Sequence, residues 1–149
     1  MTINFYSTAH AYGEFSNFAS YPVEIDGKTW KTTEHYFQAM KFEGTPYAEE
    51  IRKAKIPMIA ALKGRSRKRR RRRGWEGVKL AIMRKALEAK FTQHPELREL
   101  LLSTGDEKLV EHTEHDEYWG DGGDGSGRNW LGRLLMELRE KLVREGGGS

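Results

Sequence analysis

Apolar residues recur every three or four positions in two long segments, and this spacing constrains the fold more than any other feature. The first segment predicts an amphipathic helix of about 16 residues, with an apolar face made of Trp75, Val78, Ile82, Ala86 and Ala89. The second predicts a helix over about 129–144, with an apolar face made of Leu131, Leu134, Leu135, Leu138 and Leu142. Each helix must bury its apolar face against other elements, so the chain is expected to be helix-rich.

Turn and capping signals divide the rest of the chain into short elements. Asp26-Gly27, between two β-prone runs, is a strong hairpin signal, and short helices are expected where threonine or proline stands at a helix start. The expected strands are 3–6, 21–25, 28–30 and 108–113, and the expected short helices are 32–42, 46 onward, 57–64 and 95–103. This order predicts an α+β fold, a helix-rich single domain with a small antiparallel sheet.

The length of 149 residues suits one domain, expected over 1–145, and the remaining Gly-Gly-Gly-Ser at 146–149 is typical of an appended linker. The sequence has no cysteine, which excludes a disulfide framework and thiolate zinc sites and fits a reducing compartment. Apolar runs are only a few residues long and the N-terminus has no basic and apolar leader, so neither a membrane span nor a secretory signal is expected. A cytoplasmic protein is the resulting prediction.

The net charge of +4 comes from a single segment. Lys63–Arg73 holds nine basic residues and no acidic one, and in the rest of the chain 17 basic residues face 22 acidic ones. An acidic domain with one basic patch attracts phosphate, nucleic acid or an anionic surface at that patch. A solvated loop without a ligand stays open as an alternative, because runs rich in Lys and Arg are weakly specific.

The predicted helix over 32–42 combines apolar flanks with one polar stripe. At about 100° per residue, Glu34, Gln38 and Lys41 lie within about 60° of one another. Since apolar residues flank this stripe on both sides, the helix is expected to be buried and the stripe to line a cavity or find partners. Glu34 stands in the first turn, where the helix dipole favours the carboxylate and suits a base, a nucleophile or a cation-stabilising group. A capping glutamate beside a solvated lysine is the structural alternative.

Six glycines among residues 120–132 let the backbone approach a ligand closely, just before a helix N-terminus. The G-x-G-x-x-G pattern inside this segment does not open a Rossmann unit, because no room follows for the second half of a βαβ unit. The aspartates at 116, 121 and 124 do not follow calcium-loop spacing, and His112 with His115 lacks the further ligands of a zinc site. No metal or cofactor is expected, and a merely flexible loop is the alternative to a binding loop.

Several motifs follow one another from about Asn4 to Leu142. They are Phe15-Ser16-Asn17-Phe18, Trp30-x-Thr32-x-Glu34-His35-Tyr36-Phe37-Gln38-Ala39-x-Lys41-Phe42, Trp75-x-x-Val78-Lys79, Tyr118-Trp119-Gly120-Asp121-Gly122 and Gly127-x-Asn129-x-Leu131-Gly132-x-Leu134-Leu135-Met136. In this order they resemble the YbiA-like NADAR family. One departure is the uninterrupted basic run Lys68–Arg73, which other residues break in the family.

The resemblance implies an N-glycosidase that cleaves the ribosyl–nitrogen bond of phosphorylated early intermediates of riboflavin biosynthesis, with a small phosphorylated ribosyl compound as its partner. Related members of the family remove ADP-ribose from modified guanine in nucleic acid, so an ADP-ribosyl hydrolase acting on ADP-ribosylated nucleic acid is an alternative. Two further alternatives are a non-catalytic module that binds ADP-ribose or nucleic acid, and a structural scaffold that keeps the family motifs.

Cleavage of an N-glycoside passes through an oxocarbenium-like ribosyl cation, so an anion beneath the ring is the main electrostatic aid. Glu34 suits this role, directly or by orienting water, and Asp116 or Asp121 is expected to supply a second carboxylate. Alternatively, a desolvated Lys41 or Lys79 attacks an opened ribose as an amine and forms a Schiff base, and the sequence leaves both routes open. The residues expected to bind the substrate are Asn17, Phe18, Gln38, Arg65, Trp75, Trp119, Gly120, Gly122 and Asn129, the two tryptophans by stacking.

Overall fold

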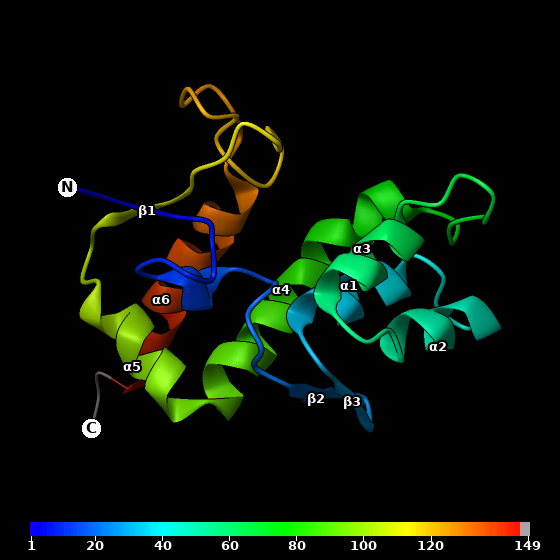
Figure 1. Ribbon diagram of the computed structural model, residues 1–149. Coiled ribbons are helices and arrows are strands. Elements are labelled where there is room, and N and C mark those ends of the chain that lie inside the picture. The colour runs from blue at the N-terminus through cyan, green and yellow to red at the C-terminus, as the bar shows by residue number, and fades with distance from the viewer. Residues whose placement is uncertain (147–149) are drawn as a thin grey trace. The chain divides into compact units, whose positions relative to one another are not determined.

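The computed structural model describes residues 1–146, which divide into two compact units (Figure 1). Unit 1 comprises Met1–Ala19 and the chain from His94 onward, and unit 2 comprises Ser20–Gln93. Residues 147–149, which belong to the expected linker, lie outside the described residues. Gly146, the first residue of that expected linker, instead ends a helix. A single domain over 1–145 stays a prediction.

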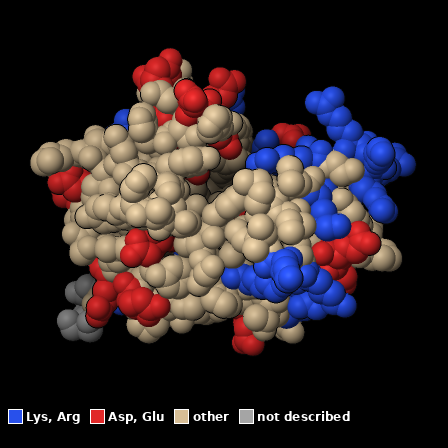
Figure 2. All heavy atoms as spheres, in the orientation of Figure 1, with Lys and Arg blue, Asp and Glu red and all other residues tan. Residues whose placement is uncertain are grey.

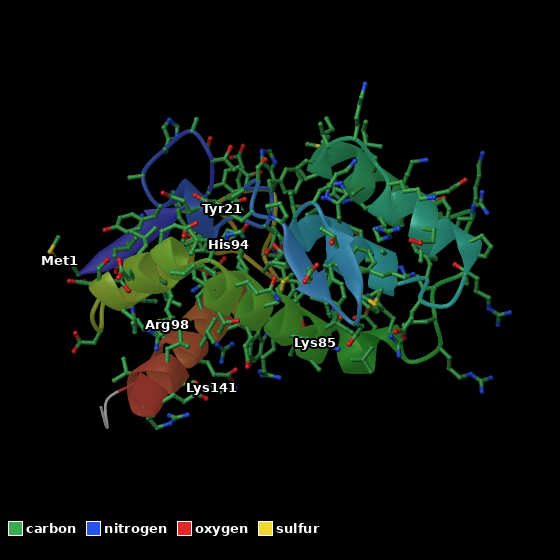
Figure 3. The ribbon with its side chains drawn as sticks, turned by 90° about the horizontal axis from the view of Figure 1, so that it is seen from below. Met1, Tyr21, Lys85, His94, Arg98 and Lys141 are labelled. Atoms are coloured by element: carbon green, nitrogen blue, oxygen red, sulfur yellow. The ribbon has the colours of Figure 1, made fainter. Side chains whose placement is uncertain are left out.

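The hairpin of unit 2 forms where the sequence predicts it. Strand β2 (Val23–Ile25) pairs antiparallel with strand β3 (Lys28–Trp30). The two turn residues, Asp26 and Gly27, have φ angles of 52° and 80°, as a two-residue turn that follows the strand twist requires. Lys85, labelled in Figure 3, extends from the long helix α4 (Trp75–Gln93), and its Nζ lies 2.8 Å from Oδ2 of Asp26.

Helix α1 (Thr33–Met40) is the centre of unit 2 and packs against the three other helices of that unit (Figure 1). These are α2 (Pro46–Arg52), α3 (Pro57–Gly64) and α4. The side chain of Thr32 caps α1 by accepting a hydrogen bond from the backbone N–H of His35 at 3.2 Å. Every residue of α1 is buried, which confirms the prediction drawn from its apolar flanks.

The inward face of α4 agrees with the predicted one at Trp75 and Ala86, which are buried, and differs at the other three positions. Val78, Ile82 and Ala89 are only half-buried, whereas Met83, Leu87 and Phe91 are almost fully buried. These last three residues also recur every four positions, so α4 has two apolar stripes and the sequence alone cannot rank them. In the folded chain, α4 packs against α1 and β2. These tertiary contacts decide which of its two apolar stripes is buried.

Unit 1 combines a parallel strand pair with two helices. Strand β1 (Thr2–Phe5) pairs parallel with strand β4 (Lys108–Glu111), a pairing that the predicted antiparallel sheet does not include. A 3₁₀ turn, η1 (Gly13–Phe15), follows β1, and helices α5 (Pro95–Ser103) and α6 (Trp130–Gly146) complete the unit.

Helix α6 packs against β4 and α5. All five leucines of its predicted apolar face are buried. Within residues 1–146, no helix is both long and apolar enough to cross a membrane. The fold is α+β and helix-rich, as predicted.

Candidate active site

The polar stripe of α1 is buried. Glu34, Gln38 and Lys41 have only 7%, 5% and 7% of their surface exposed. Within the stripe, the side-chain Nε2 of Gln38 donates a hydrogen bond to Oε2 of Glu34 at 2.8 Å. Burial of a carboxylate and an ammonium group costs free energy unless partners compensate for it. The stripe is therefore either a structural network or a binding site.

Gly64, at the end of α3, adjoins both Gln38 and Lys41. The Nζ of Lys41 donates to the backbone carbonyl of Gly64 at 3.3 Å. A Cβ at position 64 would lie 2.7 Å from the Cβ of Gln38, so only glycine leaves room for the Gln38 side chain. The sequence predicts Gly64 only as a helix stop, because the close approach of α3 to α1 is a tertiary contact.

One hydrogen-bonding atom of the Gln38 side chain has no partner among the described residues. Its Oε1 is buried and accepts no hydrogen bond from the described residues. Buried acceptors without a donor are rare in folded proteins, and each one calls for an explanation. The Gln38 Oε1 atom lies against Gly64 at the end of α3, whose missing Cβ leaves the space that this atom occupies.

The pKa of Lys41 is lowered to about 8. Burial is the largest cause, and the positive charges of Arg71, Arg65 and Lys79 act in the same direction, while Glu34 opposes them. With a pKa of about 8, about a tenth of the Lys41 side chains are neutral at pH 7, against fewer than about one in a thousand for an ordinary lysine. A neutral amine is the form of a lysine that can act as a nucleophile.

Two other predicted site residues, Lys79 and Trp75, lie on α4, and both contact neighbouring side chains. Lys79 Nζ donates to Oε1 of Glu76 at 2.6 Å, so this ammonium group is ion-paired. The ring of Trp75 is 5% exposed and lies against Phe37, with ring centroids 5.2 Å apart and a tilt of 60°. The Nζ of Lys41 lies 5.8 Å from the centroid of that same Phe37 ring. Phe37, which the sequence places only on an apolar flank, therefore joins Trp75 to the polar stripe.

The basic segment Lys63–Arg73 begins in the last turn of α3, and from Arg65 onward it forms a largely exposed loop; Figure 2 shows lysine and arginine side chains gathering over this region. The loop is fastened to the end of α1, because the N–H of Arg72 donates to the carbonyl of Lys41 at 2.6 Å and its guanidinium to Glu43 at 2.7 Å. Arg65, a predicted substrate-binding residue, is exposed. A cavity of about 540 Å³ between loop and helix end is lined by Phe42, Glu43, Thr45 and Arg70–Arg73.

In unit 1, both predicted carboxylates organise the backbone around them. Oδ1 of Asp116 accepts hydrogen bonds from the N–H groups of Tyr118 and Trp119, at 2.9 and 2.8 Å. Asp121, 6% exposed, accepts from the N–H groups of Thr113 and Gly123 and bonds Nδ1 of His112 at 2.7 Å.

The net effect lowers the pKa of Asp121. Burial by itself would raise this pKa, but the hydrogen bonds from His112 and from the two N–H groups outweigh it. A carboxylate with a lowered pKa is a poor general acid at neutral pH, so Asp121 is suited to hold the loop.

The Asn129 side chain hydrogen-bonds the backbone of β4 in the way that a neighbouring strand would. Its Nδ2 donates to the carbonyl of Leu109 at 2.9 Å, and its Oδ1 accepts from the N–H of Glu111 at 3.0 Å. A Cβ on Gly120 would lie 2.8 Å from the carbonyl oxygen of Glu111, so this glycine is required by packing. Gly122 has a φ angle of 74°, and its N–H donates to the carbonyl of Asp116 at 3.1 Å.

Three further predicted residues of unit 1 have these positions. Asn17 is buried just after η1, Phe18 is half-buried beside it, and Trp119 is half-buried with its ring 4.9 Å from that of Tyr118. Trp119 is therefore more exposed than Trp75. Among residues 1–146, no three His, Cys, Asp or Glu side chains gather as a metal site would require.

The family model described as the NADAR domain matches residues 4–143 of this chain. The chain belongs to the NADAR family. The match spans both units and includes the α1 stripe and the glycine-rich loop of residues 120–127.

NADAR proteins of known name agree with this assignment. N-glycosidase YbiA from Escherichia coli (strain K12) is 63% identical over 143 residues, which cover 96% of this chain and 89% of that protein. The NMR structure of E. coli YbiA superposes with a TM-score of 0.91 at 62% identity and covers 97% of this chain and 86% of that one. The riboflavin biosynthesis protein PYRR, chloroplastic, from Zea mays is 42% identical over 156 residues, which cover 95% of this chain and 25% of that protein. This NADAR chain is accordingly an enzyme of the N-glycosidase type.

Proposed function

We propose that this enzyme hydrolyses the N-ribosyl bond of phosphorylated ribosylamino-pyrimidine intermediates of riboflavin biosynthesis. Two kinds of relative support the substrate class, one named N-glycosidase and one named riboflavin biosynthesis protein. The observation that supports the chemistry is the α1 stripe, where a buried carboxylate, a buried amide with a free acceptor and a buried lysine stand side by side.

Glu34 is the group proposed to stabilise the reaction's cationic transition state. As the C1′–N bond lengthens, its electron pair leaves with the amine, and positive charge develops on the ribosyl ring. The Glu34 carboxylate, desolvated in the first turn of α1, faces that charge or orients the water whose oxygen bonds to C1′. The water loses one proton and the leaving amine gains one, so atoms and charge balance.

Gln38 is proposed to bind a substrate hydroxyl. Its Nε2 is engaged with Glu34, and its unpartnered Oε1 would accept a hydrogen bond from a ribose hydroxyl. Such a bond would hold the sugar next to the Glu34 carboxylate, and it would also satisfy the one buried acceptor left over in the stripe. Binding and charge stabilisation would then come from neighbouring turns of one rigid helix.

A covalent route through Lys41 is the second mechanism that the site supports. In that route the neutral amine attacks C1′ of the ring-opened ribose, the base leaves, and the imine is released by water. The lowered pKa of Lys41, about 8, favours this residue over the ion-paired Lys79.

Reduction with borohydride during turnover tests the covalent route. If that route operates, a sugar adduct is trapped on Lys41, and peptide mass spectrometry identifies the modified lysine. Turnover that continues without any adduct would leave direct attack by water as the mechanism.

The basic segment Lys63–Arg73 supports a second candidate function, removal of ADP-ribose from modified guanine in nucleic acid. Arginines along an exposed loop are suited to contact several phosphates of a polynucleotide at once. A non-catalytic module for the same ligand would bind with the same salt dependence but without turnover. A cytoplasmic location stays a prediction for either function.

A product assay followed by mass spectrometry separates these functions. Ribosylamino-pyrimidine phosphates and ADP-ribosylated guanosine are offered in parallel under identical conditions. We expect release of the pyrimidine amine and ribose phosphate from the first substrate, at a kcat/KM at least tenfold above that for the second. Faster cleavage of ADP-ribosylated guanosine would reverse the assignment, and binding without any product would reduce the chain to a binding module.

A further inference from the structure

Unit 1 contains a cavity of about 390 Å³ that the proposed chemistry does not use. One wall is a single face of the parallel strand pair: Thr2 lies opposite Lys108 and Asn4 opposite Val110 in the register. The other wall is the α6 end of the unit, where Asn129, Arg133 and Met136 follow helical spacing, together with Gly125, Gly127 and Arg128 of the glycine-rich loop. A cavity of this size is within the range of small-molecule sites.

Positive charge gathers at this cavity although its unit is acidic. Unit 1 holds 14 Asp and Glu residues but only seven Lys and Arg, and three of those seven line this one cavity. They are Lys108, Arg128 and Arg133, and none of them forms an ion pair within residues 1–146. Elsewhere on α6 the exposed cations do find acids, since Arg144 lies 3.1 Å from Glu140.

An aromatic ring lies near each of the two guanidinium groups of the cavity. Arg133 lies over the ring of Trp130 at 4.0 Å, and Arg128 lies over the ring of Tyr118 at 6.0 Å. Stacking at the distance of the Arg133–Trp130 pair restricts the rotamers of an arginine, whereas the Arg128–Tyr118 distance is at the outer limit of a cation–π contact. The fork of a guanidinium then matches two oxygens of a phosphate group.

Asp121 is the one acidic side chain that lines the cavity. Its carboxylate is already bound by His112 and by the N–H groups of Thr113 and Gly123. These donors offset much of its charge, so three cations face one compensated anion. The cavity therefore attracts anions, with Thr2 and Asn4 available as further hydrogen-bonding groups.

We propose that this cavity is a binding site for a phosphate group, held by Arg133 and Arg128 with Lys108 as the third cation. Nothing in this argument depends on the glycosidase reaction. The phosphate belongs either to the ribosyl substrate or to a separate small phosphorylated ligand, and the two sources share this chemistry.

A titration with inorganic phosphate, followed by amide NMR shifts of the ¹⁵N-labelled chain, tests the site. We expect saturable shifts at Lys108–Val110 and at residues 125–133, and a dissociation constant at least tenfold weaker in Arg133→Ser. Arg144→Ser on the same helix is the matched control and should bind phosphate as the parent does. An unchanged constant in Arg133→Ser, or shifts confined to the basic segment Lys63–Arg73, would overturn the proposal. Thermal melts of each variant establish that it is folded.

Kinetics of the same variants identify the source of the phosphate. If the site holds the substrate's own phosphate, Arg133→Ser raises KM for the phosphorylated ribosyl substrate about tenfold or more and leaves KM for its dephosphorylated form unchanged. If a separate ligand binds there, both KM values stay constant while phosphate binding is weakened. Absence of turnover on every substrate would refute the glycosidase proposal and leave the titration as the test of the site.

Discussion

The α1 stripe of unit 2 and the glycine-rich loop of unit 1 both contain polar residues that the sequence marks as functional, but the two regions use them differently. In the loop, Asp121 and Asn129 have their side-chain oxygens bonded to backbone N–H groups. In the stripe, Gln38 keeps a buried acceptor without a donor. Buried polar groups that are fully bonded stabilise an architecture, whereas a buried acceptor without a donor calls for a separate explanation.

The two units also differ in charge. Unit 2 holds 19 basic and eight acidic residues, and unit 1 holds seven basic and 14 acidic ones. The excess in unit 2 surrounds Lys41, whose pKa it helps to lower. Charge that acts on a buried group changes chemistry, while the same charge on an exposed loop mainly changes association with polyanions.

The largest effect is expected from Glu34→Gln, which keeps the size of the side chain but removes its charge. If this charge stabilises the ribosyl cation, kcat falls by roughly 10²–10³ or more, while the thermal midpoint changes little. Steady-state kinetics and a thermal melt measure the two quantities. Glu50→Gln, an exposed carboxylate on α2, is the control and should retain activity. Near-parental turnover in a folded Glu34→Gln protein would remove Glu34 from the mechanism.

Asp121→Asn tests the other half of the comparison. The change removes the charged partner of His112 and one acceptor of the loop, so unfolding should become easier by about 1–3 kcal/mol. In the fraction that is folded, kcat should stay within about tenfold of the parent, because the carboxylate is proposed to hold the loop. Asp124→Asn, exposed in the same loop, is the control for denaturation and kinetics. A hundredfold loss of kcat at unchanged stability would show that Asp121 takes part in catalysis.

Acid should weaken the two units in different pH ranges. His35, fully buried in α1, bonds Thr32 through Nδ1 at 2.8 Å and the carbonyl of Ala54 through Nε2 at 3.0 Å, and burial lowers its pKa. His35 therefore binds a proton more readily in the unfolded chain than in the folded one. As the pH drops below about 6.5, the free energy of unfolding falls by at most about 1.4 kcal/mol per pH unit.

Asp121, whose pKa is lowered, instead loses its contribution only as the pH falls below about 4. Amide hydrogen exchange of α1 and of the loop, measured from pH 7 to about pH 3, distinguishes the two ranges. The acid-dependent loss of protection in α1 should be absent in His35→Gln. Equal protection of α1 at pH 7 and pH 5 in the parent would contradict the proposed effect of His35.

The smallest effect on a small substrate is expected from neutralising Arg70–Arg73 to serine. Adjacent side chains point in different directions, so at most one or two of these arginines can reach one phosphate. The kcat/KM for the small substrate should change less than about tenfold and depend weakly on salt. Affinity for a nucleic acid should instead fall by orders of magnitude in this variant, as it does for the parent between about 50 and 200 mM salt. Equal and large losses on both substrates would refute the small-substrate assignment.

Local sequence signals predict much of the fold and part of the site. Asp26-Gly27 determines the hairpin turn because its positive φ angles suit the strand twist, and the five leucines of α6 determine its buried face because they recur with helical spacing. The polar stripe of α1 follows from the same periodicity. These features depend on neighbours within one or two turns, so no tertiary information is needed to predict them.

Tertiary structure decides the rest, because it depends on residues that are distant in the chain. The β1–β4 pair joins residues about a hundred positions apart, and no local pattern encodes its parallel register. Gly64 leaves room for Gln38 only because α3 approaches α1, and Asn129 bonds β4 rather than a ligand only because α6 begins beside that strand. The sequence by itself determines which residues can bear charge or hydrogen bonds. Only the folded chain determines which of those hydrogen bonds are already made, because burial and partners are properties of packing.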